Sequence, residues 1–139
     1  MKEDFFSKIE EIVTKDPRYK EEAYEFVMRA LAFTQKNFRR QGHVTGKELL
    51  EGIKEYCFEE FGTMAKSVLE HWGISKTEDF GHIVFNMVNN GLLKKTDEDK
   101  IEDFRNIYDF NDVFEHGYRQ RFQEEIKKHL KDKSNEATT

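Results

Sequence analysis

Cysteine, proline and glycine are scarce in this sequence, and each scarcity excludes something. The 139 residues include one Cys, one Pro and eight Gly. A single Cys cannot form an internal disulfide, which excludes the class of small secreted domains held together by disulfides. Few Pro and Gly, together with 37% charged residues, favour a mainly helical chain with well-solvated helix faces.

Long apolar runs are also missing. Because no cationic start is followed by an apolar stretch, we expect neither a secretory signal nor a membrane span, and we expect a cytoplasmic location. Aromatic residues make up 14% of the chain, and thirteen Phe can fill one sizeable core. We therefore predict a single helical domain over residues 1–131 and a disordered polar tail over residues 132–139.

Two N-terminal helices are predicted within residues 1–42. The first has apolar residues at helical spacing, namely Phe5, Ile9, Ile12 and Val13. It should end before Asp16 and Pro17, which suit the N-cap and first position of the next helix. The buried stripe of that second helix is Ala23, Phe26, Val27, Ala30, Leu31 and Thr34. Arg39-Arg40 and Gly42 supply its expected stop.

Three shorter helices, ending at Gly91-Leu92-Leu93, follow in the order found in a winged helix. Their predicted start and stop signals are the Thr45–Glu48 capping box, Gly62, a Thr63 cap, Gly73 and the Ser75–Glu78 capping box. The third carries apolar residues at the spacing of one buried helix face, namely Phe80, Ile83, Val84, Met87 and Val88. Residues 43–110 are therefore predicted to form a winged-helix-like core.

The wing itself is ambiguous in the sequence. After the polar loop, Phe104, Asn106, Tyr108 and Phe110 occupy every second position. This period of two predicts a strand returning against Leu92–Lys95. A competing reading places one helical turn here, capped by Thr96 and Asp99. The predicted fold class is mainly α with minor β (α+β minor): a winged-helix-like three-helix core with a short β-hairpin, an N-terminal helical pair and a long C-terminal helix.

The C-terminal helix is predicted over residues 111–131, with Asn111 as its cap. Apolar residues recur every four positions, at Phe114, Tyr118, Phe122, Ile126 and Leu130. Such a row drifts by about 40° per step around a helix of 3.6 residues per turn. The first three should pack on the domain, whereas Ile126 and Leu130 need another surface. We therefore expect a protein partner or a homodimer through this helix.

Charge argues against nucleic acid as the main partner. The net charge is −5, and the predicted wing carries Asp97, Glu98 and Asp99, which repel phosphates. The outward positions of the third helix would be Lys76, Asp79, His82, Asn86 and Asn89. The alternative reading is a nucleic-acid-binding regulator. Its phosphate contacts would come from the basic C-terminal helix, namely from Arg119, Arg121, Lys127, Lys128, Lys131 and Lys133.

Motifs that carry chemistry do not occur. The sequence lacks a Gly-rich phosphate loop, a paired-Cys zinc pattern, a Gly-x-Ser-x-Gly elbow and a His-Glu-x-x-His motif. His71 and His82 could bind a metal with His43 or Glu70, but helix-end and solvated roles are favoured for them. Cys57 is interpreted as a small buried hydrophobe. We predict no catalytic residue, metal or cofactor; a metal-dependent or acid-base enzyme is the third reading.

Several uncommon strings between Asp16 and Phe114 occur together. They include Val68-Leu69-x-His71-Trp72-Gly73-Ile74, Thr77-Glu78-Asp79-Phe80-Gly81-x-Ile83-Val84-Phe85-Asn86 and Asp103-Phe104-x-x-Ile107-Tyr108-Asp109-Phe110. On these strings the chain resembles a family of small uncharacterised bacterial proteins. The resemblance implies a bacterial origin and no particular activity. The extended basic C-terminal helix is less typical of that family.

The function predicted from the sequence is a noncatalytic protein-interaction module. Phe85 lies off the main buried stripe of its helix, which suits either a protein-binding face or packing under the C-terminal helix. The predicted interaction residues are Phe85, His82, Asn86, Asn89, Ile126 and Leu130.

Overall fold

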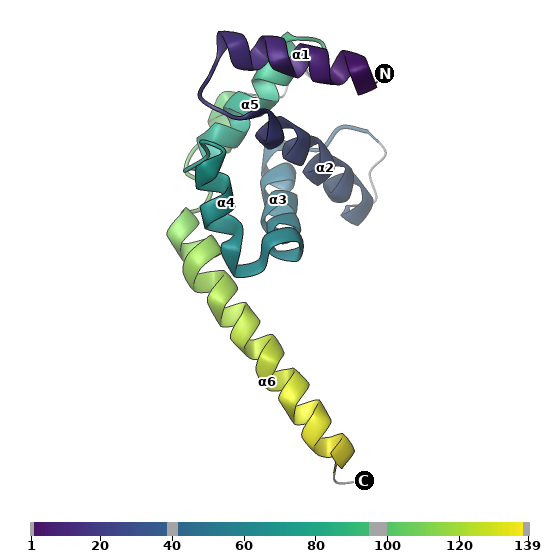
Figure 1. The fold of residues 1–139 in the computed structure, drawn as a ribbon, viewed down its shortest axis with the longest axis vertical. Coiled ribbons are helices and arrows are strands. Elements are labelled where there is room, and N and C mark those ends of the chain that lie inside the picture. The colour runs from purple at the N-terminus through teal and green to yellow at the C-terminus, as the bar shows by residue number, and fades with distance from the viewer. Residues whose placement is uncertain (1, 39–41, 95–99, 138–139) are drawn as a thin grey trace.

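The computed structural model describes residues 2–38, 42–94 and 100–137 of the chain (Figure 1). The longer helices are α1 (Lys2–Lys15), α2 (Glu21–Asn37), α3 (Gly46–Phe61), α4 (Ala65–His71), α5 (Thr77–Asn89) and α6 (Tyr118–Ala137). Two short 3₁₀ helices are η1 (Gly62–Met64) and η2 (Ile101–Phe104), and η3 (Asn111–Gly117) is a π-helical stretch. The mainly helical prediction is confirmed, and the described residues contain no strand.

One hydrophobic core joins the helices of the globular body. Helix α2 packs along α3 and also contacts α5, and α1 lies across one end of the body (Figure 1). Fully buried side chains come from all five body helices, including Ile12, Tyr24, Ile53, Leu69 and Phe80. Helix α6 leaves the opposite end and extends away from the body (Figure 1). Within the described residues, no helix combines the length and hydropathy needed to span a bilayer.

Predicted signals that depend only on neighbouring residues are confirmed at both ends of α3 and at the end of α4. The Glu48 amide donates to Thr45 Oγ1 at 3.1 Å, and the Thr45 amide donates to Glu48 Oε1 at 2.9 Å, so the capping box is confirmed. Gly62 follows α3 with φ of 53°. Gly73 follows α4 with φ of 92°, and a Cβ there would overlap the Arg18 carbonyl oxygen. Only glycine fits this approach of two backbone segments.

The start of α2 differs from the prediction. Asp16 does not cap it, because α2 begins at Glu21 and Lys20 is its N-cap residue. Asp16 instead accepts from the Arg18 amide at 3.2 Å and from the guanidinium Nε at 2.8 Å and Nη2 at 2.7 Å. The bidentate Arg18 pair satisfies the carboxylate in a turn that lets Tyr19 reach the core. Arg39-Arg40 lies outside the described residues.

Two further predicted caps are wrong. Thr63 lies inside η1, and α4 begins only at Ala65. At the start of α5 the carboxylate of Asp79, not of Glu78, accepts from the backbone amides of Ser75 and Lys76, at 2.9 and 3.2 Å. The predicted Ser75–Glu78 capping box is therefore shifted by one residue. Because Glu78 does not cap α5, its carboxylate can accept a hydrogen bond from the segment that follows η2.

The predicted β-hairpin is not supported. Ile101 and Phe104 lie in the 3₁₀ turn η2, and the Phe104 ring is buried against Gly46 and Gly81. The following amides bind α5 side chains rather than a strand. Asn106 N donates to Glu78 Oε1 at 3.1 Å, and Ile107 N donates to Thr77 Oγ1 at 3.2 Å. The competing helical turn is closer to the structure, although its Thr96–Asp99 cap lies outside the described residues.

The C-terminal helix is longer than predicted. The π-helical η3 leads directly into α6, which continues past Lys131 to Ala137, so residues 132–137 are helical where we expected a disordered tail. The Asp112 amide donates to Asp109 Oδ1 at 3.1 Å, so Asp109 acts at this helix start in place of the predicted Asn111. Thr138 and Thr139 lie outside the described residues.

Candidate functional site

The base of α6 is anchored on α3. Phe114 and Tyr118 are buried, and the Tyr118 hydroxyl donates to the Lys54 carbonyl oxygen. Arg121 Nη1 lies 2.9 Å from Glu55 Oε2, and its guanidinium carbon lies 4.1 Å from the centre of the Phe58 ring. An ion pair combined with a cation–π contact fixes the direction in which the helix leaves the body.

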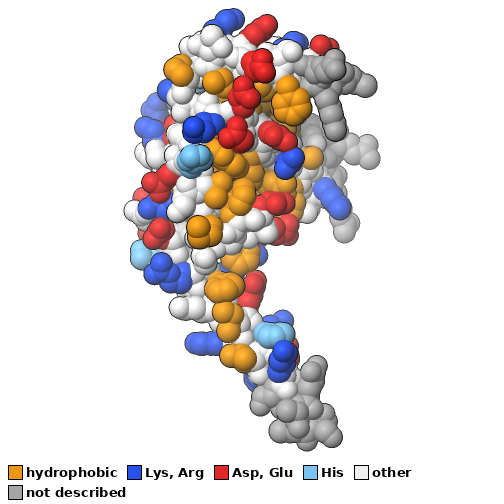
Figure 2. Space-filling view, in the orientation of Figure 1, with side chains coloured by type: hydrophobic (Ala, Val, Ile, Leu, Met, Phe, Trp, Pro, Cys, Tyr) orange, Lys and Arg blue, Asp and Glu red, His pale blue; other side chains and the backbone are white. Residues whose placement is uncertain are grey.

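Beyond Arg121 the apolar row of α6 is uncovered. Phe122 is 46% exposed, Ile126 44% and Leu130 60%, so Phe122 does not pack on the body as predicted. We call residues 122–133 the arm. Figure 2 shows its hydrophobic side chains as a row along one face of the helix. Lys127, which neighbours this row, makes no ion pair with any residue that the structure describes.

A second apolar feature lies on the body, where rings of α2, α3 and the end of α4 stack. Ring centres of contacting pairs lie between 5.2 and 5.7 Å apart. We call this cluster the aromatic surface; it consists of Phe26, Phe33, Tyr56, Phe61 and Trp72. Phe26 is buried, and the other four rings are half-buried. Stacked, partly solvated rings of this kind can accept a further apolar side chain.

Carboxylates border the aromatic surface. Burial, and after it the carboxylate of Glu60, raises the pKa of the Tyr56 phenol, and Glu59 acts in the same direction. On α2, the ion pair of Glu25 with Arg29 spans 2.6 Å, and Glu22 lies one turn before Phe26. Figure 2 shows a hydrophobic area on the body with Asp and Glu along its edges. The aromatic surface is therefore an apolar area with an acidic rim.

The aromatic surface was not predicted from the sequence. Tyr56 and Phe61 satisfy the apolar periodicity of their helix, and periodicity alone cannot separate a half-buried ring from a buried one. The available signal in the sequence was Phe33, a large apolar residue beside Thr34 that lies outside the predicted buried stripe of α2. Its contact with Tyr56 could not be predicted from the sequence, because that contact joins α2 to α3.

Two side chains of α5 that were predicted to point outward contact the body instead. Asp79, predicted to point outward, is buried, and the Tyr19 hydroxyl donates to its Oδ1 at 2.6 Å. Burial and then the Asp79 carboxylate raise the pKa of the Tyr19 phenol. Asn86, also predicted to point outward, donates through Nδ2 to Asp16 Oδ2 at 2.9 Å and to the Tyr24 hydroxyl at 3.0 Å. These polar residues hold α5 against the α1–α2 turn and α2.

The remaining predicted residues of α5 do not form a cluster with the arm. His82 and Phe85 are half-buried, and Phe85 packs against the core, whereas Asn89 is exposed near the helix end. The structure therefore separates the predicted interaction residues into an inward-held group, Phe85 and Asn86, and an exposed group, which is Asn89 on α5 with Ile126 and Leu130 on α6. Ile126 and Leu130 are the large apolar members of the exposed group.

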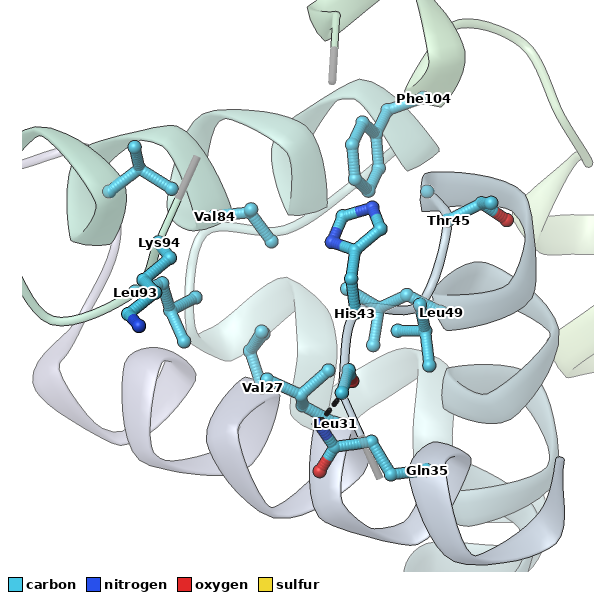
Figure 3. Close-up of a pocket in the computed structure, with 14 residues that line it drawn as sticks. Val27, Leu31, Gln35, His43, Thr45, Leu49, Val84, Leu93, Lys94 and Phe104 are labelled. Carbon is cyan, nitrogen blue, oxygen red and sulfur yellow. Dashed lines mark hydrogen bonds between the residues drawn. The ribbon is translucent and has the colours of Figure 1, made fainter. Parts of the chain in front are cut away.

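A cavity of about 310 Å³ opens between α2, the start of α3 and α5 (Figure 3). Its walls are mostly aliphatic, and His43 points toward Phe104 within it (Figure 3). Two polar groups of the wall already serve the fold. Gln35 Nε2 donates to the Gly42 carbonyl at 2.8 Å, and Thr45 caps α3. The cavity can accommodate an apolar group, but its geometry does not pair a nucleophile with a base.

Metal and thiol chemistry find no support in the described part of the chain. No group of three or more His, Cys, Asp or Glu side chains is placed there to hold a metal ion. His71 is exposed, His82 is half-buried, and they lie on different helices. Cys57 is fully buried, and burial raises the pKa of its thiol far above the usual range, which disfavours the reactive thiolate.

Comparison with known proteins adds no functional assignment. The chain matches no protein-family model, no curated protein and no solved structure.

Proposed function

We propose that this protein is a noncatalytic protein-interaction module whose arm binds the surface of another protein chain. The observation that carries the proposal is the exposed row of Phe122, Ile126 and Leu130 on a helix that leaves the body. Burying apolar surface stabilises a complex by about 25 cal/mol per Å², so three large side chains provide a substantial driving force.

Because its base is anchored on the body, the arm is better suited to bind a partner than a flexible tail would be. The Arg121–Glu55 pair and the buried Tyr118 fix the first turn of α6, so the row projects in a defined direction. A preorganised helix loses less conformational entropy on binding than a disordered segment would. Apolar residues spaced along one helix face are the feature by which grooves in partner proteins recognise helices.

A photo-crosslinking amino acid placed at Ile126 tests the proposal in cells. We expect a covalent adduct with a protein of defined mass, because the side chain at this position is exposed on the arm. The matched control carries the crosslinker at Lys8, an exposed residue of α1. If the two positions give the same adducts, or if neither gives one, the arm does not bind a protein.

The alternative is nucleic-acid binding through the arm. Its specific support is the set of exposed cations on α6, namely Arg119, Lys127, Lys128, Lys131 and Lys133. The remaining predicted contact, Arg121, is already paired with Glu55. Charge alone gives nonspecific duplex affinity of about 10⁻⁴ to 10⁻⁶ M at physiological salt. Sequence-selective binding well below that range in a filter or anisotropy assay would favour this alternative.

A further inference from the structure

We propose that the protein bound by the arm is a second copy of this chain, and that each arm lies across the aromatic surface of the other copy. This inference rests on the proposed function and names its partner. The resulting dimer has two equivalent contacts, each joining the arm of one copy to the aromatic surface of the other.

The positions of the two features allow both contacts to form at once. Figure 2 shows a hydrophobic area on the body and the hydrophobic row of the arm on the same face of the molecule. They are separated along the long axis, with the body at one end and α6 at the other (Figure 1). A two-fold axis that is perpendicular to the long axis and parallel to this face brings the two copies face to face in opposite directions. Each arm then lies over the body of the other copy. Such an isologous interface closes at two copies.

Charge complementarity supports the same pairing. The carboxylates Glu124 and Glu125 lie in the first part of the arm, whereas its distal part, from Lys127 to Lys133, carries four lysines and only the carboxylate of Asp132. The distal part is therefore the basic part of the arm. The rim of the aromatic surface carries an excess of acid, with Glu22, Glu25, Glu59 and Glu60 against Arg29. Opposite charges around an apolar centre steer association and set the orientation of the two copies.

Size and side-chain chemistry also match. Residues 122–133 span about 18 Å of helix, at 1.5 Å per residue. Two packed helices lie about 8–10 Å apart, so the arm is long enough to cross both α2 and α3. Its row brings Phe122, Ile126 and Leu130 to half-buried rings, and lysine ammonium groups near such rings gain cation–π attraction.

Charge reversal on each side of the contact gives a decisive experiment. One variant reverses the arm, with Lys127→Glu and Lys128→Glu. The other reverses the rim, with Glu59→Lys and Glu60→Lys. All four residues are exposed. Circular dichroism and thermal melts test whether each variant folds. Light scattering and sedimentation equilibrium then measure the mass of each variant alone and of the mixture.

In the dimer that we propose, each variant alone places like charges against each other. We expect the dissociation constant of each homodimer to rise about tenfold or more. Mixing the variants pairs a reversed arm with a reversed rim and a native arm with a native rim. The mixture should therefore restore a dimer containing one chain of each type. Glu10→Lys with Glu11→Lys, both exposed on α1, is the matched control and should leave the native dimer intact.

Three results would overturn the second-copy inference. If the native chain is monomeric at every concentration measured, the proposed dimer does not form. A rim variant that dimerises as well as the native chain shows that the aromatic surface is not the contact. Failure of the mixed variants to associate removes the reciprocal pairing. If the Ile126 crosslink nevertheless captures a protein of different mass, the proposed function survives with another partner, so the two failures can be told apart.

Discussion

At the scale of single residues, buried polar contacts determine how α5 sits in the body. Replacing Tyr19 with Phe removes the hydroxyl that donates to Asp79 at 2.6 Å. We expect a loss of about 1–3 kcal/mol in the free energy of unfolding, because a buried carboxylate loses a donor. Urea unfolding measures it.

Tyr24→Phe is the matched control for this change. It removes only an acceptor, and Asn86 keeps its bond to Asp16 at 2.9 Å. The Tyr19 variant should therefore lose more stability than the Tyr24 variant. Equal losses would mean that general packing, and not the Asp79 carboxylate, dominates at both positions.

Asp16 makes the stability of the fold sensitive to acid. Its hydrogen bonds to Arg18, followed by that to Asn86, hold the pKa of the carboxyl well below its usual value, although burial opposes them. A carboxyl with a lowered folded pKa stabilises the fold above its unfolded pKa of about 3.9. This contribution is lost as pH falls toward the lower folded pKa.

The prediction is tested by urea unfolding of the native chain and of Asp16→Asn from about pH 7 to about pH 2. The variant should be the less stable at neutral pH, and the difference should shrink below about pH 4 as the native carboxyl becomes protonated. A difference that stays constant with pH would show that the Asp16 charge does not contribute.

Gly52 is a residue at which two helices meet too closely for a side chain. A Cβ there would overlap Thr34 Oγ1, which is itself buried and donates to the Ala30 carbonyl at 2.7 Å. We expect Gly52→Ala to destabilise the fold by about 1–3 kcal/mol, measured by thermal or urea unfolding. Adding Thr34→Ala should recover part of the loss; no recovery would place the strain elsewhere.

At the scale of elements, the sequence predicts what neighbouring residues determine. Apolar periodicity places the body helices, and the Thr45–Glu48 capping box is confirmed because both of its hydrogen bonds lie within four residues. The exposure of Ile126 and Leu130 also agrees with the prediction. A row spaced every four residues drifts by about 40° per step, so between Phe114 and Leu130 it leaves the helix face that packs on the body.

Tertiary contacts explain the elements that the sequence analysis predicted wrongly. The period-two pattern from Phe104 to Phe110 resembles a strand, but Thr77 and Glu78 bind the amides that a strand would pair. Asp is a residue type favoured at N-caps, yet Asp16 accepts a hydrogen bond from the side chain of Asn86 on α5, which is distant in sequence. Neither partner can be identified from local sequence, since both depend on how α5 packs.

At the scale of the whole molecule, charge is divided between the two ends. The chain carries a net charge of −5, whereas the segment from Lys127 to Lys133 is basic. Opposite charges attract, but this basic segment cannot fold back onto its own acidic body, because α6 is a continuous helix directed away from it (Figure 1). Association that uses this division should weaken as salt rises, because exposed charges are screened within about 8–10 Å at physiological ionic strength.

Truncation separates the arm from the body. A chain ending at Arg121 keeps buried Phe114 and Tyr118 and the Arg121–Glu55 pair. We expect its melting temperature to stay within about 4 °C of the full chain, which corresponds to roughly 1 kcal/mol, while light scattering shows that association is lost. A chain ending at Phe110 is the control, because it also removes the two buried rings and should not fold. If the chain ending at Arg121 unfolds, α6 belongs to the core; if it still associates, the binding surface lies on the body alone.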